Sequence, residues 1–179
     1  VADDPGMHSS QNEQDSRHYA KASKIMMLEP ADSAECKEYT KLAFDLSEKF
    51  DTPVFVRLST RVSHSQGLVE LMDRCEVKLK PYEKNIPKNV MMPGNAKKKH
   101  PLVEQRLVDL ATYAETSTLN RVEMGDTKLG IITSSTSYQY AKEVYGEGAS
   151  ILKLGMVWAF PEKLIKDFVS KVEKVIVIE

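Results

Sequence analysis

Short apolar runs alternate with amphipathic stretches along much of this chain, and the alternation predicts successive β–α units. Residues 25–28 form an apolar run that predicts a short buried strand, and residues 54–58 predict a second one. Between them, residues 31–50 repeat apolar side chains at helical spacing, behind an Asp32–Glu35 pair typical of a helix start. Two strands joined by one helix form a βαβ unit, so we expect parallel strands with a right-handed crossover.

The same rhythm returns in the last third of the chain. Near-continuous apolar runs predict strands at residues 129–134, 149–154 and 175–178. Helical spacing predicts helices at residues 135–144 and 161–172 between them. Apolar strands alternating with helices are typical of a parallel sheet covered on both faces. The pattern therefore predicts an α/β fold built from parallel-sheet βαβ units.

Residues 60–100 interrupt this alternation. They contain three prolines and end in the basic run Lys97–His100, for which a solvated surface is favoured over a binding patch. We interpret the stretch as an extended connector, because domain boundaries fall at such changes in composition. Pro101 then suits the first turn of a helix. The predicted parts are residues 1–60, a connector at 61–119 with a helix at about 101–117, and an α/β domain at 120–179.

Composition excludes several classes of function. The chain has 179 residues, with 25 Lys and Arg against 26 Asp and Glu, so its net charge gives no reason to expect nucleic acid or an anionic membrane as a partner. No apolar run approaches the ~18 residues of a membrane-spanning helix. With only Cys36 and Cys75, a disulfide framework, a four-cysteine zinc site and an iron–sulfur cluster are excluded within the chain. Reduced thiols fit a cytoplasmic protein.

The polar loop at residues 3–17 is the stretch most suggestive of function. It follows the apolar start of the chain, and ligands of open α/β sheets bind beyond the carboxyl ends of strands. A polar ligand or a subunit interface would suit it, although composition alone favours a solvated surface loop. The candidate cofactor-binding or interface residues there are Asp4, His8, Ser9, Ser10, Gln11, Asn12, Gln14, Asp15 and Arg17.

A second group of candidates lies at and beyond the end of the strand predicted at residues 54–58. Arg57, Arg61 and His64 could meet the polar loop and bind a carboxylate or a phosphate, for which a guanidinium is suited. For an arginine in this place, however, a structural ion pair with Asp15 or Asp51 is the more frequent outcome. The hydroxyl run at residues 133–137 indicates helix capping more than phosphate binding. We predict no metal site and assign no catalytic residue.

Several unusual segments follow one another along the chain. They are ADDPGMHSSQNEQDSRHYAK (2–21), LEP (28–30), PVFVRLSTRVSHS (53–65), GDTKLGIITSSTSYQYAKEV (125–144) and LKLGMVWAFPEKLIKDF (152–168). In this order they resemble the alpha subunits of the indolepyruvate ferredoxin oxidoreductase family. The resemblance covers almost the whole chain and is weakest at residues 66–100. Ala22, Met26 and Ala159 depart locally from the family's pattern.

The resemblance implies a function for a longer parent protein. The family carries out oxidative decarboxylation of aryl 2-oxoacids to acyl-CoA in anaerobes, with thiamine diphosphate, Mg2+ and 4Fe-4S clusters as cofactors. A beta subunit, ferredoxin, coenzyme A and the aryl 2-oxoacid are the implied partners. Residues 1–60 would end a pyrimidine-binding domain, and residues 120–179 would form a transketolase C-terminal-like three-layer domain.

The resemblance also implies what the chain lacks. The family's activating glutamate lies before residue 1, and its diphosphate-binding motif and cluster cysteines lie after residue 179. We therefore expect an internal fragment that binds none of these cofactors alone and is inactive by itself. The alternative is a non-catalytic α/β assembly or protein-binding module.

Overall fold

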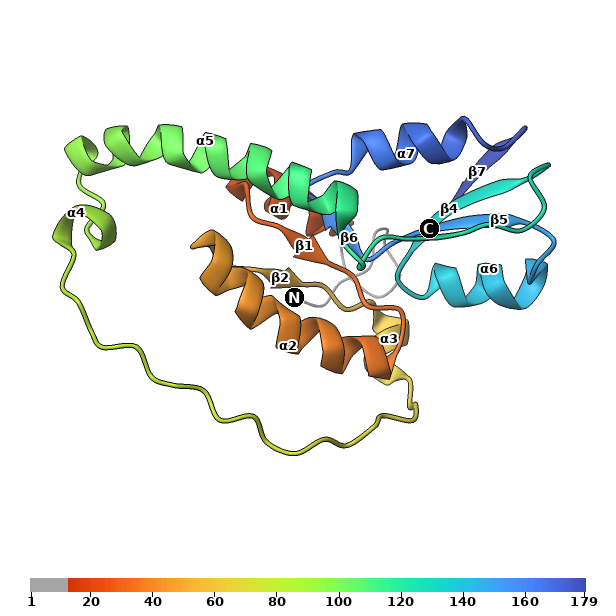
Figure 1. The fold of residues 1–179 in the computed structure, drawn as a ribbon, viewed down its shortest axis with the longest axis horizontal. Coiled ribbons are helices and arrows are strands. Elements are labelled where there is room, and N and C mark those ends of the chain that lie inside the picture. Colours follow the sequence, from red (N-terminus) through yellow and green to blue (C-terminus); the bar gives the residue numbers. More distant parts are fainter. Residues whose placement is uncertain (1–12) are drawn as a thin grey trace.

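A computed structural model describes residues 13–179 and arranges them as two small sheets with helices around them (Figure 1). In the first sheet β1 (Met27–Leu28) lies between β2 (Phe55–Val56) and β6 (Met156–Trp158). β1 and β2 are parallel, whereas β6 is antiparallel to β1. The helix α2 (Ser33–Phe50) connects β1 to β2, so the predicted βαβ unit is present.

Helix α2 begins where the sequence predicts. The Asp32 carboxylate accepts a hydrogen bond from the Glu35 backbone N–H at 2.9 Å and so caps the helix. Glu35 does not complete the expected reciprocal pair, because its carboxylate accepts from the N–H of Ala31 instead, at 2.8 Å. The buried face of α2 packs with β1, β6 and the long helix α5 (Pro93–Thr116) into one apolar core.

The second sheet has the strand order β3-β5-β4-β7. Its strands β4 (Gly130–Ser134), β5 (Ser150–Leu154) and β7 (Val175–Ile178) are parallel, and β3 (Arg121–Glu123) runs antiparallel to β5. Neighbouring residues of these strands pack on opposite faces, against α6 (Ser137–Tyr145) on one side and α7 (Glu162–Val169) on the other (Figure 1). The predicted α/β fold, with helices on both faces of this sheet, is confirmed.

Two antiparallel strands correct the expectation of purely parallel sheets. β3 and β6 have three residues each, too few for a periodic pattern to distinguish them from loop. β6 follows β5 after the single residue Gly155 and pairs with β1 of the other sheet. The last third of the chain therefore contributes a strand to the first sheet.

The predicted connector contains an extended segment between short helices, and its long helix begins earlier than predicted. Residues 66–85, which we call the arm, contain no helix or strand, and the short helices α3 (Thr60–His64) and α4 (Ile86–Asn89) flank it. Helix α5 begins at Pro93 and not at Pro101, which lies inside it. Pro101 has no backbone N–H to donate to the carbonyl oxygen of Lys97, one turn earlier in the helix. Because Pro101 is exposed, water can bond to that oxygen instead.

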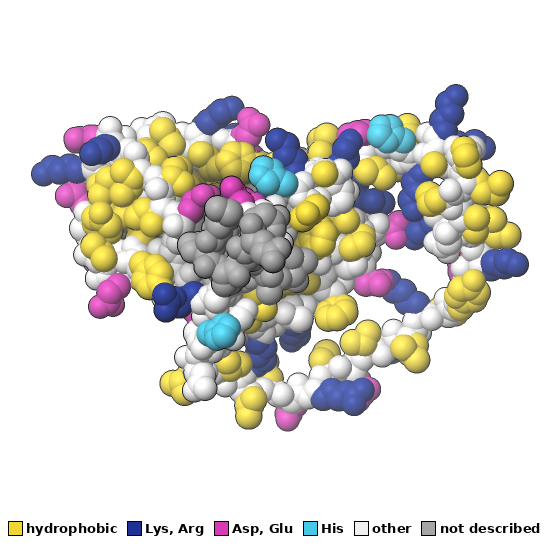
Figure 2. Space-filling view, turned by 180° about the vertical axis from the view of Figure 1, so that it is seen from behind, with side chains coloured by type: hydrophobic (Ala, Val, Ile, Leu, Met, Phe, Trp, Pro, Cys, Tyr) yellow, Lys and Arg dark blue, Asp and Glu magenta, His cyan; other side chains and the backbone are white. Residues whose placement is uncertain are grey.

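The arm leaves the body of the protein and returns to it at α4 (Figure 1). Its large apolar side chains are exposed to solvent, namely Leu68, Leu71, Met72, Val77, Leu79 and Tyr82. Figure 2 shows apolar groups along the length of the arm. Among residues 13–179, no helix is both long enough and apolar enough to cross a membrane.

Candidate functional site

A cavity of about 670 Å3 lies where the carboxyl ends of strands from both sheets meet. Glu29 directly follows β1, Arg57 directly follows β2, Ser134 ends β4 and Glu179 directly follows β7, and all four line the cavity. Ligands of open α/β sheets bind at such carboxyl ends. This cavity is therefore the candidate functional site.

A buried ion pair forms part of the cavity wall. Arg57 Nη1 lies 2.6 Å from Glu29 Oε1, and the two side chains are 6% and 1% exposed. The hydroxyl of Ser134 donates to the other Glu29 oxygen at 2.8 Å and so joins the second sheet to the first. Arg57 thus forms a structural ion pair as expected, but with Glu29, which comes to the same edge through the pairing of β1 with β2. The charge of Arg57 also contributes to lowering the pKa of Asp15.

Arg17 lines the cavity from the start of α1 (Arg17–Ser23). Its Nε and Nη2 donate to the Asp15 carboxylate at 2.9 and 2.7 Å, and Nη1 donates to Glu179. Burial alone would raise the pKa of Asp15, but the hydrogen bonds and charge of Arg17 hold it below its usual value. Asp15 in turn raises the pKa of Arg17, so both groups stay charged.

Arg61 and His64 line the cavity from α3. Ser59 caps this short helix by accepting from the Val62 N–H at 3.3 Å, and buried Val62 anchors it. Within the described part of the chain no carboxylate is within ion-pair distance of Arg61 or His64. Unlike Arg17 and Arg57, these two side chains are therefore available to an anionic ligand.

Hydroxyl groups line the side of the cavity formed by α6; they belong to Ser134, Ser135, Thr136, Ser137 and Tyr140. The expected capping role is wrong, because Thr136 occupies the N-cap position without a side-chain capping bond and Ser134 bonds to Glu29. Ser135 has φ 48°, in the left-handed region that residues with a side chain adopt at a cost of about 1–2 kcal/mol. The turn from β4 to α6 is thus held in a specific shape.

The cavity collects four of the predicted candidates, namely Arg17, Arg57, Arg61 and His64. Asp15 meets it through Arg17, whereas exposed Gln14 does not line it. Asp4, His8, Ser9, Ser10, Gln11 and Asn12 lie outside the described residues. Sequence reasoning missed Glu29, Tyr140 and Glu179. Glu29 carried a usable signal, since it follows its strand as Arg57 follows the neighbouring one.

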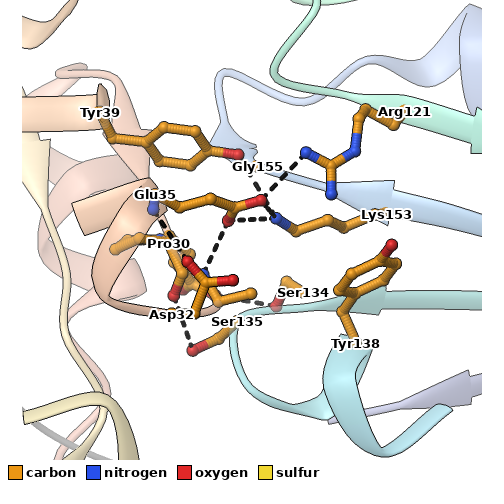
Figure 3. A network of polar contacts seen from close by, with 12 residues as sticks. Pro30, Asp32, Glu35, Tyr39, Arg121, Ser134, Ser135, Tyr138, Lys153 and Gly155 are labelled. Carbon is orange, nitrogen blue, oxygen red and sulfur yellow. Dashed lines mark hydrogen bonds and ion pairs between the residues drawn. The ribbon is translucent and has the colours of Figure 1, made fainter. Parts of the chain in front are cut away.

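A second polar cluster ties the two sheets together beside the cavity (Figure 3). Fully buried Lys153 of β5 forms an ion pair with both carboxylate oxygens of Glu35, and Arg121 of β3 reaches Glu35 Oε1 at 3.0 Å. The Lys153 ammonium also lies 5.1 Å from the ring centre of Tyr138. Burial alone would raise the pKa of Glu35, but Lys153 and its other partners lower it below its usual value. The cluster is a charged contact that links α2 to β3 and β5 of the second sheet.

Metal ligands do not gather in the part of the chain that the structure describes. Residues 13–179 contain no group of three or more His, Cys, Asp or Glu side chains that could hold a metal ion. Cys36 is half-buried in α2, and burial raises the pKa of its thiol, while Cys75 is exposed on the arm. These residues do not fit the Mg2+ or the iron–sulfur clusters of the family, and no reaction step follows from them.

No family model matches the chain. It is 43% identical over 184 residues to the indolepyruvate oxidoreductase subunit IorA of Archaeoglobus fulgidus, and 40% identical over 190 residues to that of Thermococcus kodakarensis. Both alignments cover all of this chain. The chain is homologous to a segment of IorA. It spans 30% and 29% of the length of these two curated relatives.

A solved structure supports the fold. A 2-oxoglutarate:ferredoxin oxidoreductase from Magnetococcus marinus, with 2-oxoglutarate, coenzyme A and succinyl-CoA bound, superposes with a TM-score of 0.54. The match covers 86% of this chain and 34% of that one, at 16% sequence identity. At this identity the likeness shows a shared α/β fold and nothing further.

Proposed function

We propose that this chain is part of the alpha subunit of an indolepyruvate:ferredoxin oxidoreductase, which oxidatively decarboxylates aryl 2-oxoacids to acyl-CoA with ferredoxin as acceptor. The observation that carries the proposal is the match to IorA over the whole chain. The position of the cavity supports it, since cationic groups meet there at the carboxyl ends of strands from both sheets. On this proposal the chain is inactive by itself.

The proposal assigns the three parts of the chain. Residues 1–60 end the pyrimidine-binding domain, residues 61–119 connect, and residues 120–179 form the transketolase C-terminal-like domain. Thiamine diphosphate would supply the carbanion chemistry. The residues that bind it, and those that bind Mg2+ and the 4Fe-4S clusters, would lie outside residues 13–179. The beta subunit, ferredoxin and coenzyme A would be the partners, in the cytoplasm.

Within this enzyme, the cavity would bind the anionic end of a substrate. Arg61 and His64 are the groups available for that role, because Arg17 and Arg57 already pair with carboxylates. Glu29 fixes Arg57, and Ser134 fixes Glu29, so the wall behind the ligand is rigid. A carboxylate of the 2-oxoacid or a phosphate of coenzyme A would satisfy this arrangement.

The test uses the native enzyme and the variant Arg61→Gln. Loss of a charge-assisted hydrogen bond predicts that KM for one of the two anionic substrates rises about tenfold. A rise for the 2-oxoacid identifies a carboxylate site, and a rise for coenzyme A identifies a phosphate site. Unchanged KM values for both would overturn the role of the cavity. Native protein that oxidises no aryl 2-oxoacid would overturn the proposed function itself.

A second candidate is a non-catalytic assembly module, which the exposed apolar side chains of the arm favour. Arg74→Gln separates the two, because Arg74 is an exposed arginine of the arm, outside the cavity. The enzyme proposal expects this variant to match the wild type in KM. The assembly candidate expects it to weaken association with a partner, measured by sedimentation.

A further inference from the structure

A second cavity, of about 440 Å3, lies at the opposite end of α2 from the Asp32 cap, between that helix end, α4 and the start of α5. We call it the basic pocket and define it by Lys88, Lys98, Lys99, Arg106 and Asp51. Residues 74–100, which lead into it, contain eight Lys and Arg against two Asp and Glu. Figure 2 shows Lys and Arg side chains over this part of the molecule.

The basic pocket has a defined framework. Lys98, Lys99, Leu102 and Arg106 lie at helical spacing on one face of α5. The Lys99 ammonium donates to the carbonyl oxygen of Lys88 at 3.1 Å, which ties α5 to α4. The Arg106 side chain is only 17% exposed, so its guanidinium is held within the surface and is not free in solvent.

Positive charge in the basic pocket exceeds what its own carboxylate neutralises. Asp51 ends α2, where the helix dipole disfavours an anion, and it pairs with Lys88 at 2.6 Å and with Arg106 at 3.7 Å. The hydrogen bond from Lys88 is the main reason why the pKa of Asp51 lies below its usual value. Lys98 has no carboxylate partner within the described residues. Four cationic side chains therefore face one carboxylate.

We propose that the basic pocket binds a small phosphorylated molecule through a diphosphate group. Such a group carries about two to three negative charges near neutral pH, which matches the excess of cations. Lysine binds phosphate as a point charge and arginine as a planar fork, so both kinds of donor are present. Pro87 and Leu102 add an apolar wall for the rest of the molecule, and the cavity volume suits a small ligand. This inference does not depend on the proposed oxidoreductase function.

The test measures amine labelling of the native protein with and without inorganic pyrophosphate, at constant ionic strength, by peptide mass spectrometry. Pyrophosphate should slow the labelling of Lys88, Lys98 and Lys99 by about fivefold, because bound anion covers their ammonium groups. Labelling of Lys163 and Lys171, exposed on or just after α7, should not change. Equal protection of all these lysines, or no protection, would overturn the proposal.

Variants make the test specific. Lys98→Gln should weaken the pyrophosphate protection of Lys99 about tenfold in apparent affinity, whereas Lys163→Gln should leave it unchanged. Lys98 is exposed, so its replacement does not threaten the fold. Protection by an acidic peptide but not by pyrophosphate would contradict the proposal and identify a protein-docking surface instead.

Discussion

The ammonium of Lys153 and the carboxylate of Glu35 form an ion pair that is almost completely excluded from solvent, with side chains 0% and 9% exposed. The two residues are distant in sequence, since Lys153 lies in β5 of the second sheet and Glu35 in helix α2, which packs against the first sheet. Their contact shows that the sheets are joined by charge as well as by apolar packing. A buried pair of this kind is costly to break, because either partner alone is a desolvated charge.

The first prediction concerns removal of one partner. Lys153→Met leaves Glu35 buried without its main counter-charge and should lower the free energy of unfolding by about 3–5 kcal/mol. The double variant Glu35→Gln/Lys153→Met should recover much of this loss, because Gln is uncharged and its single carbonyl oxygen can still accept from the Ala31 N–H. Urea unfolding measures both. Lys166→Met, in an exposed pair on α7, serves as the control, and equal losses in Lys153 and Lys166 variants would contradict the prediction.

The second prediction concerns pH. Because the pKa of Glu35 is lower in the folded protein than in the unfolded chain, its contribution is complete above the unfolded value of about 4.3 and is lost as pH falls through the folded value. The urea midpoint should therefore fall steeply below about pH 4.3. The double variant Glu35→Gln/Lys153→Met should flatten this slope, and Glu38→Gln, on the exposed side of α2, should not.

The third prediction separates the two arginines that follow β2. Arg57→Met leaves Glu29 buried without its counter-charge, so unfolding should become easier by about 3–5 kcal/mol. Arg61→Gln, at an exposed position of the same cavity, should change stability by less than about 0.5 kcal/mol. Thermal unfolding of both variants makes the comparison. A stability loss in Arg61→Gln as large as that in Arg57→Met would show that the cavity wall is not organised as described.

The fourth prediction concerns two glycines. A side chain at Gly155 would place its Cβ 2.4 Å from the backbone oxygen of Leu119, which cannot move aside. Gly155→Ala should therefore cost about 3 kcal/mol. At Gly94, in the first turn of α5, a Cβ meets nothing within 4 Å, so Gly94→Ala should stabilise the protein by about 0.5 kcal/mol. Opposite signs in urea unfolding are the expected result, and two losses of similar size would contradict it.

The fifth prediction concerns the arm. Its backbone is exposed and lacks the hydrogen bonds of a helix or strand, so trypsin should cut first after Arg74 or Lys78. The two products should stay together during gel filtration, because β6 pairs with β1 across the cut. Mass spectrometry of early time points identifies the sites. A first cut within α2 or the second sheet would contradict the described fold.

Periodicity was sufficient to predict the elements that bury one clear face or are apolar throughout. Helix α2 begins within two residues of the prediction, because it has several apolar residues at helical spacing. Strand β7 has the predicted bounds, because it is apolar throughout. β3 and β6 were missed because three residues carry no period, and their pairing depends on partners far along the chain. The start of α5 was misplaced because Pro101 resembles a helix start.

The candidate site divides in the same way. Arg57, Arg61 and His64 could be named from the sequence because polar side chains at and beyond the end of a strand stand out from an apolar run. Glu29 was missed as their partner because the contact requires β1 to lie beside β2, which composition does not reveal. The Lys153–Glu35 pair lay beyond prediction for the same reason, since a lysine in an apolar strand gives no sign of what it meets.

The passage of the chain through Gly155 has a consequence for synthesis on the ribosome. The first sheet gains β6 only when residues 156–158 become available, well after β1 and β2 have been made. Until then the β1 edge that pairs with β6 has no strand beside it and is open to pairing with other chains. The first sheet can therefore reach its final form only after residues 156–158 have been made, although its first two strands emerge much earlier.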